Sequence, residues 1–336
     1  MNSRLCSKVV PVILTSMLIS CSTVFGQTEQ PGLKLCQERK YTEARVPLEN
    51  AVRSKEYSAN GRLWNCLGLS RFQASDDKAA QKAFETAVKL EPDRLAFRVN
   101  LARLLLMNRK VNAAQKQLEF VLAAEPGHAD ALHMLTVSDS WEGKLERAMR
   151  SAERLIELHP TLNTGYILKA DLLIRELGDE TGTANARERG AEALRRSVEI
   201  LSVAKSKVTD PNGLTEVESE LENKQIFADY LAKEPLTGAS APVTQQPGVT
   251  PLKITYKQKA QYTDRARSAG VQGTITIAVL FGADGRIANT LFLKRLGYGL
   301  DENALRAAKA MRFEPQVKDG KPISVVRLVT YSFNIY

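Results

Sequence analysis

The chain has 336 residues, of which 25% are charged and three are histidine, and its formal net charge at pH 7 is +9. The histidines, His128, His133 and His159, have no metal-ligand spacing to cysteine or carboxylate residues. The sequence also lacks a Gly-x-Ser-x-Gly motif, a phosphate-binding loop and a dinucleotide-binding fingerprint. We therefore expect neither an enzyme nor a protein with a bound metal or cofactor.

The N-terminus has the pattern of an export signal. Arg4 and Lys8 precede an apolar run of 11 residues, Val9–Ile19. As a helix this run would span roughly 17 Å, which is much shorter than the ~30 Å hydrocarbon core of a membrane. Residues 1–26 therefore predict a signal peptide rather than a membrane span.

Two processing routes fit this signal peptide. Leu18-Ile19-Ser20-Cys21 resembles a lipobox, which would make a lipidated Cys21 the mature N-terminus, and this is the route that we favour. Val24-Phe25-Gly26 suits ordinary signal peptidase, with cleavage before Gln27. Either route predicts a periplasmic protein, anchored as a lipoprotein in the first case. The alternative is an uncleaved segment that holds the chain in the inner membrane.

A proline recurs with a fixed period in the first half of the chain. Pro92, Pro126 and Pro160 are 34 residues apart, a spacing typical of tetratricopeptide repeats, which contain two antiparallel helices each. The best-preserved repeat has the expected large and small residues, which are Trp64, Leu67, Gly68, Phe72, Ala80, Phe84, Ala87 and Pro92. We predict an all-α array over residues 33–233, with a last helix at about 214–233 that caps the stack.

Tetratricopeptide arrays bind partners on a concave face formed by the first helix of each repeat. The residues that we expect on this face are Asn65, Leu69, Phe72, Val99, Arg103, Met107, His133, Val137, Trp141, Ile167 and Ile174. Their apolar character fits a surface that binds a peptide or a helix about as well as it fits a groove that is already filled. The alternative is that the capping helix or the linker fills the groove.

Two cysteines besides Cys21 remain after either processing route, Cys36 and Cys66. The oxidising periplasm permits a disulfide between them. Two small buried side chains in helix packing are an equally good explanation, because the sequence does not supply their separation.

Residues 234–255 predict an extended linker. They contain Pro235, Pro242, Pro247 and Pro251 among glycine, serine, threonine and glutamine. Roughly 18 residues of polyproline-like chain reach about 55 Å. Such a linker could move a domain around a nearby partner, but it could not span the periplasm.

Residues 256–336 predict a small α+β domain with an antiparallel sheet. Residues 274–279 alternate between polar or small and branched apolar side chains, and a second strand is expected over 287–294, after a hairpin turn at Asp284-Gly285. A helix is expected at about 259–269.

A second helix is expected after Asp301, whose carboxylate is placed to cap it. The last strand begins near Val325 and runs to the end of the sequence. One face of this strand is expected to carry Val325, Val329, Tyr331, Phe333 and Ile335.

Several motifs follow one another in this region. They are Tyr262-Thr-Asp-Arg-Ala-Arg, Gly270-Val-Gln-Gly273-Thr, Asp284-Gly285-Arg286, Gly299-Leu-Asp301, Arg312-Phe-Glu-Pro315 and Asp319-Gly-Lys-Pro322. Residues 252–336 therefore resemble the TonB C-terminal domain family, although Thr263 stands where the family often has proline. The resemblance implies a periplasmic domain whose last strand pairs with a short segment of an outer-membrane transporter.

The positive charge of the chain belongs to this domain. Residues 251–336 contain 14 lysine and arginine residues against six acidic residues, whereas the other 250 residues contain 33 against 32. In an exported protein such a charge favours anionic partners, for example peptidoglycan, anionic lipid headgroups or acidic protein loops. A solvated surface that keeps the domain soluble explains it equally well. Export and the absence of an aromatic stacking motif argue against nucleic acid.

The terminal strand predicts a docking edge. An edge strand exposes unpaired N–H and C=O groups, on which a partner can add a strand. The residues that we expect at this edge are Arg327, Leu328, Val329, Thr330, Tyr331, Ser332, Phe333 and Asn334. Pairing with a periplasmic or outer-membrane protein is one use of the edge, and self-association is another.

Two functions follow from these features. The first is a periplasmic scaffold or adaptor that binds one partner in the groove of the array and another on the terminal strand. The second is an energy transducer resembling TonB proteins, which couple a proton-driven motor of the inner membrane to outer-membrane transport. A transducer needs an uncleaved membrane helix and a long spanning segment, so the short apolar run and the short linker argue against it.

Overall fold

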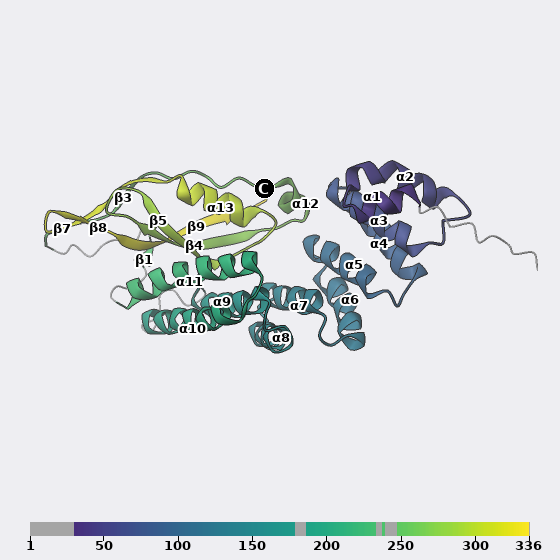
Figure 1. The fold of residues 1–336 in the computed structure, drawn as a ribbon. Coiled ribbons are helices and arrows are strands. Elements are labelled where there is room, and N and C mark those ends of the chain that lie inside the picture. The colour runs from purple at the N-terminus through teal and green to yellow at the C-terminus, as the bar shows by residue number, and fades with distance from the viewer. Residues whose placement is uncertain (1–29, 179–185, 233–236, 239–246, 336) are drawn as a thin grey trace, which may run out of the picture.

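The computed structural model describes residues 30–178, 186–232, 237–238 and 247–335. The signal peptide, Cys21 and both cleavage sites lie outside these residues, and so does much of the linker. The described chain is a helical array followed by a small strand-rich domain, which confirms the predicted fold class (Figure 1).

The array consists of helices packed in antiparallel pairs. Their bounds are α1 (Pro31–Gln37), α2 (Tyr41–Arg53), α3 (Gly61–Gln73), α4 (Asp77–Leu90), α5 (Leu95–Met107), α6 (Val111–Ala124), α7 (Ala129–Trp141), α8 (Leu145–Leu158), α9 (Asn163–Gly178), α10 (Ala186–Lys207) and α11 (Pro211–Leu231). Polar side chains begin several of them. The Asn60 side chain accepts hydrogen bonds from two amide groups of α3, and Asp76 caps α4 in the same way.

Small residues set the spacing within a repeat. A Cβ atom on Gly68 of α3 would lie 2.5 Å from the ring of Phe84 on α4, so this close approach requires glycine. Ala80 and Ala87, two turns apart on α4, are fully buried. Glycine and alanine therefore allow the two helices of this repeat to approach closely.

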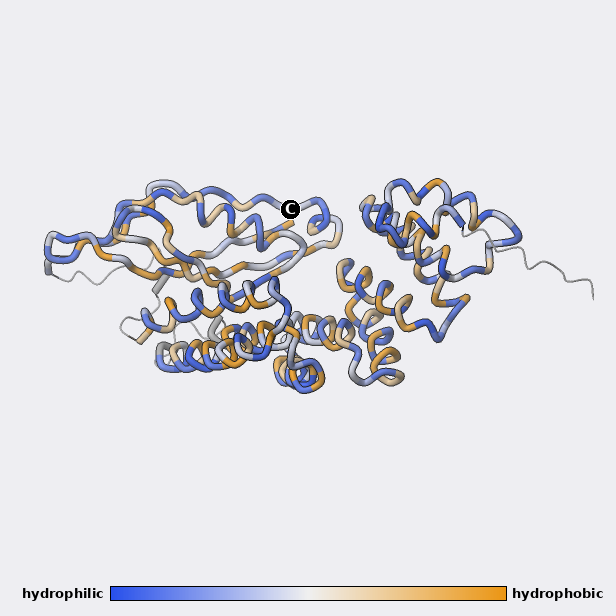
Figure 2. The backbone as a smooth tube through the Cα atoms, in the orientation of Figure 1, coloured by the Kyte–Doolittle hydropathy of each residue, from blue (hydrophilic) through white to orange (hydrophobic). Residues whose placement is uncertain are grey.

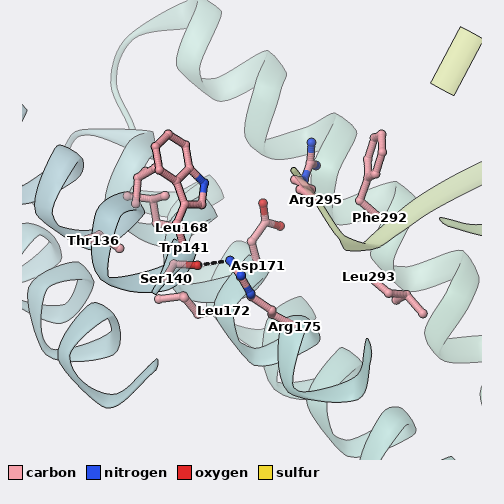
Figure 3. Close-up of a pocket in the computed structure, with 11 residues that line it drawn as sticks. Thr136, Ser140, Trp141, Leu168, Asp171, Leu172, Arg175, Phe292, Leu293 and Arg295 are labelled. Carbon is pink, nitrogen blue, oxygen red and sulfur yellow. Dashed lines mark hydrogen bonds between the residues drawn. The ribbon is translucent and has the colours of Figure 1, made fainter. Parts of the chain in front are cut away.

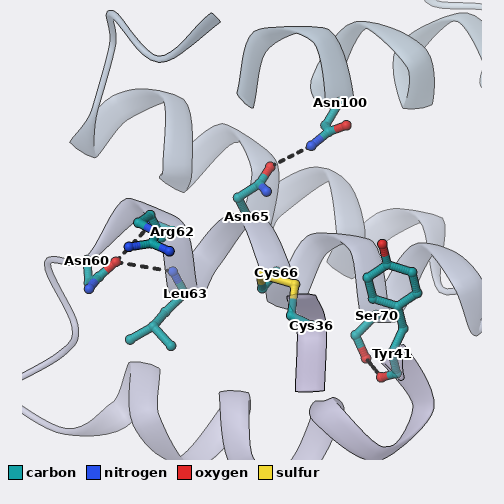
Figure 4. The surroundings of a disulfide bond; sticks show 9 residues. All are labelled: Cys36, Tyr41, Asn60, Arg62, Leu63, Asn65, Cys66, Ser70 and Asn100. Atoms are coloured by element: carbon teal, nitrogen blue, oxygen red, sulfur yellow. Dashed lines mark hydrogen bonds between the residues drawn. A yellow bond between two sulfur atoms is a disulfide. The ribbon is translucent and has the colours of Figure 1, made fainter. Parts of the chain in front are cut away.

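A disulfide joins the first helix of the array to the third (Figure 4). The Sγ atoms of Cys36 in α1 and Cys66 in α3 are 2.06 Å apart, and the Cα atoms are 5.9 Å apart. Both cysteines are also buried, in a cluster with Leu33, Leu48 and Leu63. Cys36 and Cys66 therefore form a disulfide and are also buried in helix packing, so both explanations offered for them apply.

The C-terminal domain is built on one four-stranded sheet with the order β1-β9-β4-β5. Its elements are β1 (Thr237–Gly238), β2 (Val249–Thr250), β3 (Lys253–Tyr256), α12 (Asp264–Ser268), β4 (Gly273–Phe281), β5 (Ile287–Lys294), α13 (Leu300–Lys309), β6 (Arg312–Glu314), β7 (Gln316–Lys318), β8 (Lys321–Ile323) and β9 (Val325–Phe333). Strand β4 pairs antiparallel with both β5 and β9. The short strands form two further small sheets, β2-β7-β8 and β3-β6.

Two local predictions for this domain were wrong. The helix expected at about 259–269 is only α12, because the side chain of Thr263 caps it by accepting from the Ala266 amide. Asp301 does not cap α13, which begins one residue earlier, after Gly299. Its buried carboxylate instead accepts hydrogen bonds from the amides of Leu296 and Gly297, at 2.9 and 3.1 Å.

The sheet packs on helices at both of its faces. Helices α12 and α13 cover one face, while α9, α10 and α11 lie along the other (Figure 1). The second contact is a continuous apolar core that contains Leu291 and Leu293 of β5, Ile174 of α9, and Phe227 of α11. Hydrophobic residues recur along these helices beneath the sheet (Figure 2). The domain is therefore docked on the array that precedes it, rather than carried at a distance by the linker.

The disulfide is expected to stabilise the first helices of the array. Its cysteines are 30 residues apart, and closing a loop of this length contributes about 3.5 kcal/mol in the chain-entropy model. Cys36→Ser/Cys66→Ser should lower the guanidinium unfolding midpoint, and reductant should lower that of the wild type but not that of the variant. Two titratable thiols in the oxidised native protein would contradict the bond.

Docking of the sheet can be tested at Leu291, which faces α9 and α11 and not the domain's own core. We expect Leu291→Asp to separate the domain from the array, because it removes apolar burial and adds an unpaired buried charge. The measurement is an increase in the radius of gyration by X-ray scattering. Ala288→Asp, at an exposed position of the same strand, is the control. An unchanged radius for Leu291→Asp would refute the docked arrangement.

Candidate functional site

The terminal strand β9 has one face in the core and one face in solvent along its second half. Val329, Tyr331 and Phe333 are buried against α12 and α13, whereas Thr330 and Ser332 are exposed. The predicted alternation is therefore correct as far as Phe333. The prediction that the strand runs to the end of the sequence was wrong, because β9 ends at Phe333, and Asn334 and the exposed Ile335 lie beyond it. The opposite face of its first half carries Val326 and Leu328, which pack toward the array.

The outer edge of β9 is partly covered. Thr237 and Gly238 of β1 pair in parallel with Arg327 and Leu328. The prediction that Arg327 and Leu328 belong to an open edge was therefore wrong. Their partner comes from the linker, which the sequence pattern marked as extended but not as a strand.

Beyond Leu328, no described strand pairs with the outer side of β9. The Lys257 ammonium group donates to the Thr330 carbonyl oxygen at 3.0 Å. Because the N–H and C=O groups of one strand residue point to the same side, the Thr330 amide also points away from β4. The same holds two residues further on, at Ser332. These outward groups form the open part of the edge.

The environment of this edge is cationic and partly buried. Lys257 lies 5.0 Å from the ring centroid of Tyr331, and its own burial lowers the pKa of its ammonium group. Burial raises the pKa of Tyr331 to about 12. The Tyr331 hydroxyl is buried and has no hydrogen-bond partner within the described residues. A partner that adds to this edge would therefore meet the positive charge of Lys257, while the neutral Tyr331 hydroxyl stays buried in the core.

The second candidate surface is the concave face of the array. An apolar pocket of about 300 Å³ lies between α5 and α7, and five of the predicted groove residues line it. These are Arg103, Met107, His133, Val137 and Trp141. Burial lowers the pKa of His133, although Asp130 acts in the opposite direction.

The other predicted groove residues lie elsewhere. The Asn65 side chain accepts a hydrogen bond from Asn100 at 2.9 Å. Leu69 and Phe72 pack beside the core between repeats, and Val99 and Ile174 are buried in apolar cores. Ile167 packs beside α10 and α11. Helix periodicity placed these residues on the correct helices, but it could not show which of them neighbouring helices cover.

The C-terminal domain contacts the array at two points that sequence reasoning missed. Arg265 of α12 forms an ion pair with Asp77 at 3.4 Å and lies 5.2 Å from the ring centroid of Phe72. Tyr298, in the loop before α13, contacts α5 and α7. At α5 and α7 the segment in contact with the array is therefore the loop that carries Tyr298. At α9 the capping helix α11 packs beside two of the predicted groove residues, Ile167 and Ile174, as the alternative prediction had it. The glycines beside Tyr298 were the available signal, because they marked a loop of unusual conformation.

A smaller pocket of about 150 Å³ lies where α7, α9 and β5 meet (Figure 3). Trp141 and Phe292 face it from the two domains, together with Asp171, Arg175 and Arg295. Arg175 donates to the Ser140 hydroxyl. Beside this pocket, the side chain of Lys224 is fully buried. Burial by itself lowers the pKa of Lys224, but the adjacent carboxylates Asp171 and Glu220 outweigh it and hold the pKa above its ordinary value.

The described residues contain no helix that is long and apolar enough to cross a membrane. Nor do they contain a group of three histidine, cysteine or acidic residues that could hold a metal ion.

Comparison with known families identifies both parts of the chain. Residues 258–335 match the Gram-negative bacterial TonB protein C-terminal family, and residues 71–135 match a tetratricopeptide repeat family. Protein TonB of Vibrio cholerae is 31% identical over 91 residues, which cover 26% of this chain and 37% of that protein. A human FK506-binding protein-like protein is 27% identical over 152 residues, which cover 43% of each chain. The chain thus spans less than half the length of each of these relatives.

Among solved structures, MamA from Desulfovibrio magneticus RS-1 is 17% identical, with a TM-score of 0.44, and the match covers 53% of this chain and 93% of that one. YrrB, described as a TPR protein with an unusual peptide-binding site, is 14% identical, with a TM-score of 0.41 and coverage of 56% and 88%. The family matches lie on the helical array and on the domain that contains β9. The protein therefore combines a tetratricopeptide-like helical array with a small strand-rich domain that matches the TonB C-terminal family.

Proposed function

We propose that the protein is an adaptor of the cell envelope, which holds one partner at the open edge of β9 and a second on the concave face of its array. Both matched families are protein-interaction domains. The observation that carries the proposal is the set of outward backbone groups at Thr330 and Ser332, at an edge where no described strand pairs beyond Leu328.

Strand addition suits this edge for a physical reason. Main-chain hydrogen bonds supply affinity, and alternate side chains supply specificity. At β9 the Thr330 carbonyl already accepts a hydrogen bond from Lys257, and a long lysine side chain can swing aside to admit a partner's amide. Parallel pairing of β1 with the same side of β9 supports this mode of binding.

The docked arrangement favours an adaptor, which holds its partners in place, over a transducer, which transmits force to them. The sheet shares an apolar core with α9, α10 and α11, so a partner bound at β9 is fixed relative to the array. The second candidate function, energy transduction, draws its support from the 31% identity with protein TonB over 91 residues. The two candidates differ in the membrane attachment that they require, and therefore in the fate of residues 1–26.

Thr330→Pro tests the edge. Proline removes the outward amide proton and cannot donate to an added strand, so affinity for the edge partner should fall at least about tenfold. Envelope proteins retained by the immobilised wild-type chain would be compared with those retained by the variant. Thr330→Ala, which keeps the amide, is the matched control, and circular dichroism would verify that both variants fold. Equal retention by wild type and a folded Thr330→Pro would remove strand addition from the proposal.

The identity of the mature N-terminus distinguishes the adaptor function from the transducer function. We expect either an acylated Cys21 or a chain that starts at Gln27, as determined by the intact mass of protein purified from fractionated membranes. Cys21→Ser should abolish the acylated form if the lipobox is used. A full-length chain that begins at Met1 and resides in the inner membrane would overturn the adaptor as proposed and favour the transducer.

A further inference from the structure

Tyr298 of the C-terminal domain inserts its side chain into the concave face of the array. Its hydroxyl donates to the Leu106 carbonyl oxygen at 2.8 Å, in the last turn of α5, where helix carbonyls concentrate partial negative charge. Its ring lies 6.2 Å from that of Trp141, and the Arg109 guanidinium lies 5.3 Å from its centroid. The position therefore suits an aromatic ring with a hydroxyl donor. Burial raises the pKa of Tyr298, although Arg109 opposes the shift, so the hydroxyl keeps its proton.

The loop that presents Tyr298 is held in a strained conformation. Tyr298 has φ +62°, and the glycines on either side of it both have φ +76°. The left-handed region is unfavourable for a bulky side chain, by on the order of 1 kcal/mol or more. The domain itself braces the loop, since Asp301 accepts two loop amides and the Thr263 hydroxyl donates to the Tyr298 carbonyl at 2.7 Å. The strain persists because these bonds and the contacts with the array hold the loop in place.

An apolar pocket lies directly beside the inserted ring. The pocket of about 300 Å³ between α5 and α7 shares Leu106 and Trp141 with the contacts of Tyr298. Met107, Met134 and Val137 complete its apolar lining, and the Arg103–Asp130 ion pair lies at its rim. An apolar cavity of ~150 Å³ is enough to hold benzene. A bulky apolar side chain therefore fits next to the tyrosine position.

We propose that this face of α5 and α7 is a docking site for a partner segment with a tyrosine and a bulky apolar residue close to it, and that Tyr298 occupies the site in cis. The inference rests on the adaptor function proposed above and defines its groove partner. The partner's tyrosine takes over the bond to the Leu106 carbonyl, and its apolar residue fills the adjacent pocket. That second contact supplies the differential free energy by which the partner displaces Tyr298.

In this arrangement Tyr298 and the partner's tyrosine compete for the same site on α5 and α7. A partner's apparent affinity is reduced by the fraction of molecules in which Tyr298 occupies the site. Removal of the Tyr298 side chain should therefore strengthen binding in trans, by about tenfold or more if the coupling is of ordinary size.

The loop's own sequence provides the probe. A fluorescein-labelled peptide of residues 294–301, Lys-Arg-Leu-Gly-Tyr-Gly-Leu-Asp, would be titrated into full-length wild type and Tyr298→Ala, with anisotropy as the readout. We expect saturable binding to Tyr298→Ala that is at least about tenfold tighter than to wild type. A peptide with alanine in place of tyrosine should not bind. Tyr256→Ala, which removes an exposed tyrosine of the same domain, is the matched control and should behave as wild type. Trp141→Leu in the Tyr298→Ala chain should abolish binding.

Several outcomes would overturn the inference. They are no saturable binding to Tyr298→Ala at millimolar peptide, equal affinity for the two chains, and binding that survives loss of the peptide's tyrosine. If intact wild-type chain binds Tyr298→Ala more tightly than the peptide does, the occupant is a second copy and not an outside partner. Retention of the edge partner in the Thr330→Pro comparison does not depend on this loop, so failure here leaves the edge function standing.

Discussion

Burial of both faces of the C-terminal sheet is the constraint on which the rest of the structure depends. Ile275, Ile277 and Val279 of β4 face α12 and α13, while Ala278 between them faces the array. A sheet with one apolar face is complete when its own helices cover that face, but this sheet has apolar residues on the second face as well. Contact with α9, α10 and α11 removes those residues from water. The linker therefore connects two parts of one packed body.

The same packing decides which edge of the sheet remains open. At β5 the Asn223 side chain of α11 donates to the Thr290 carbonyl at 3.0 Å, so the array itself covers part of that edge. At β9 the coverage consists of two residues of β1 and the side chain of Lys257. A natural sheet usually protects its edges. Here the array covers part of the β5 edge, whereas beyond Leu328 no described strand covers the edge of β9 that we propose for partners.

Docking also connects the two candidate surfaces. Tyr298 and Arg265 belong to the domain that carries β9, and both contact the array, Tyr298 on its concave side. A protein that displaces Tyr298 from α5 would change one contact of that domain, while the apolar core beneath the sheet would remain. The fold thus permits local opening at the groove without separation of the domains. This is the behaviour expected of an adaptor that must exchange partners at one surface and keep its geometry at the other.

The sequence by itself determined those features that depend on neighbours along the chain. The 34-residue period, Gly68 at the contact with Phe84 and the positive-φ turns at Gly285 and Gly320 all reflect local geometry. Only the tertiary structure decided the bond between Cys36 and Cys66, the pairing of β1 with β9, the role of Asp301 and the insertion of Tyr298. These features join segments between four and 192 positions apart. Periodicity identifies which residues share a face, but the contacts of that face depend on which other surfaces compete to cover it.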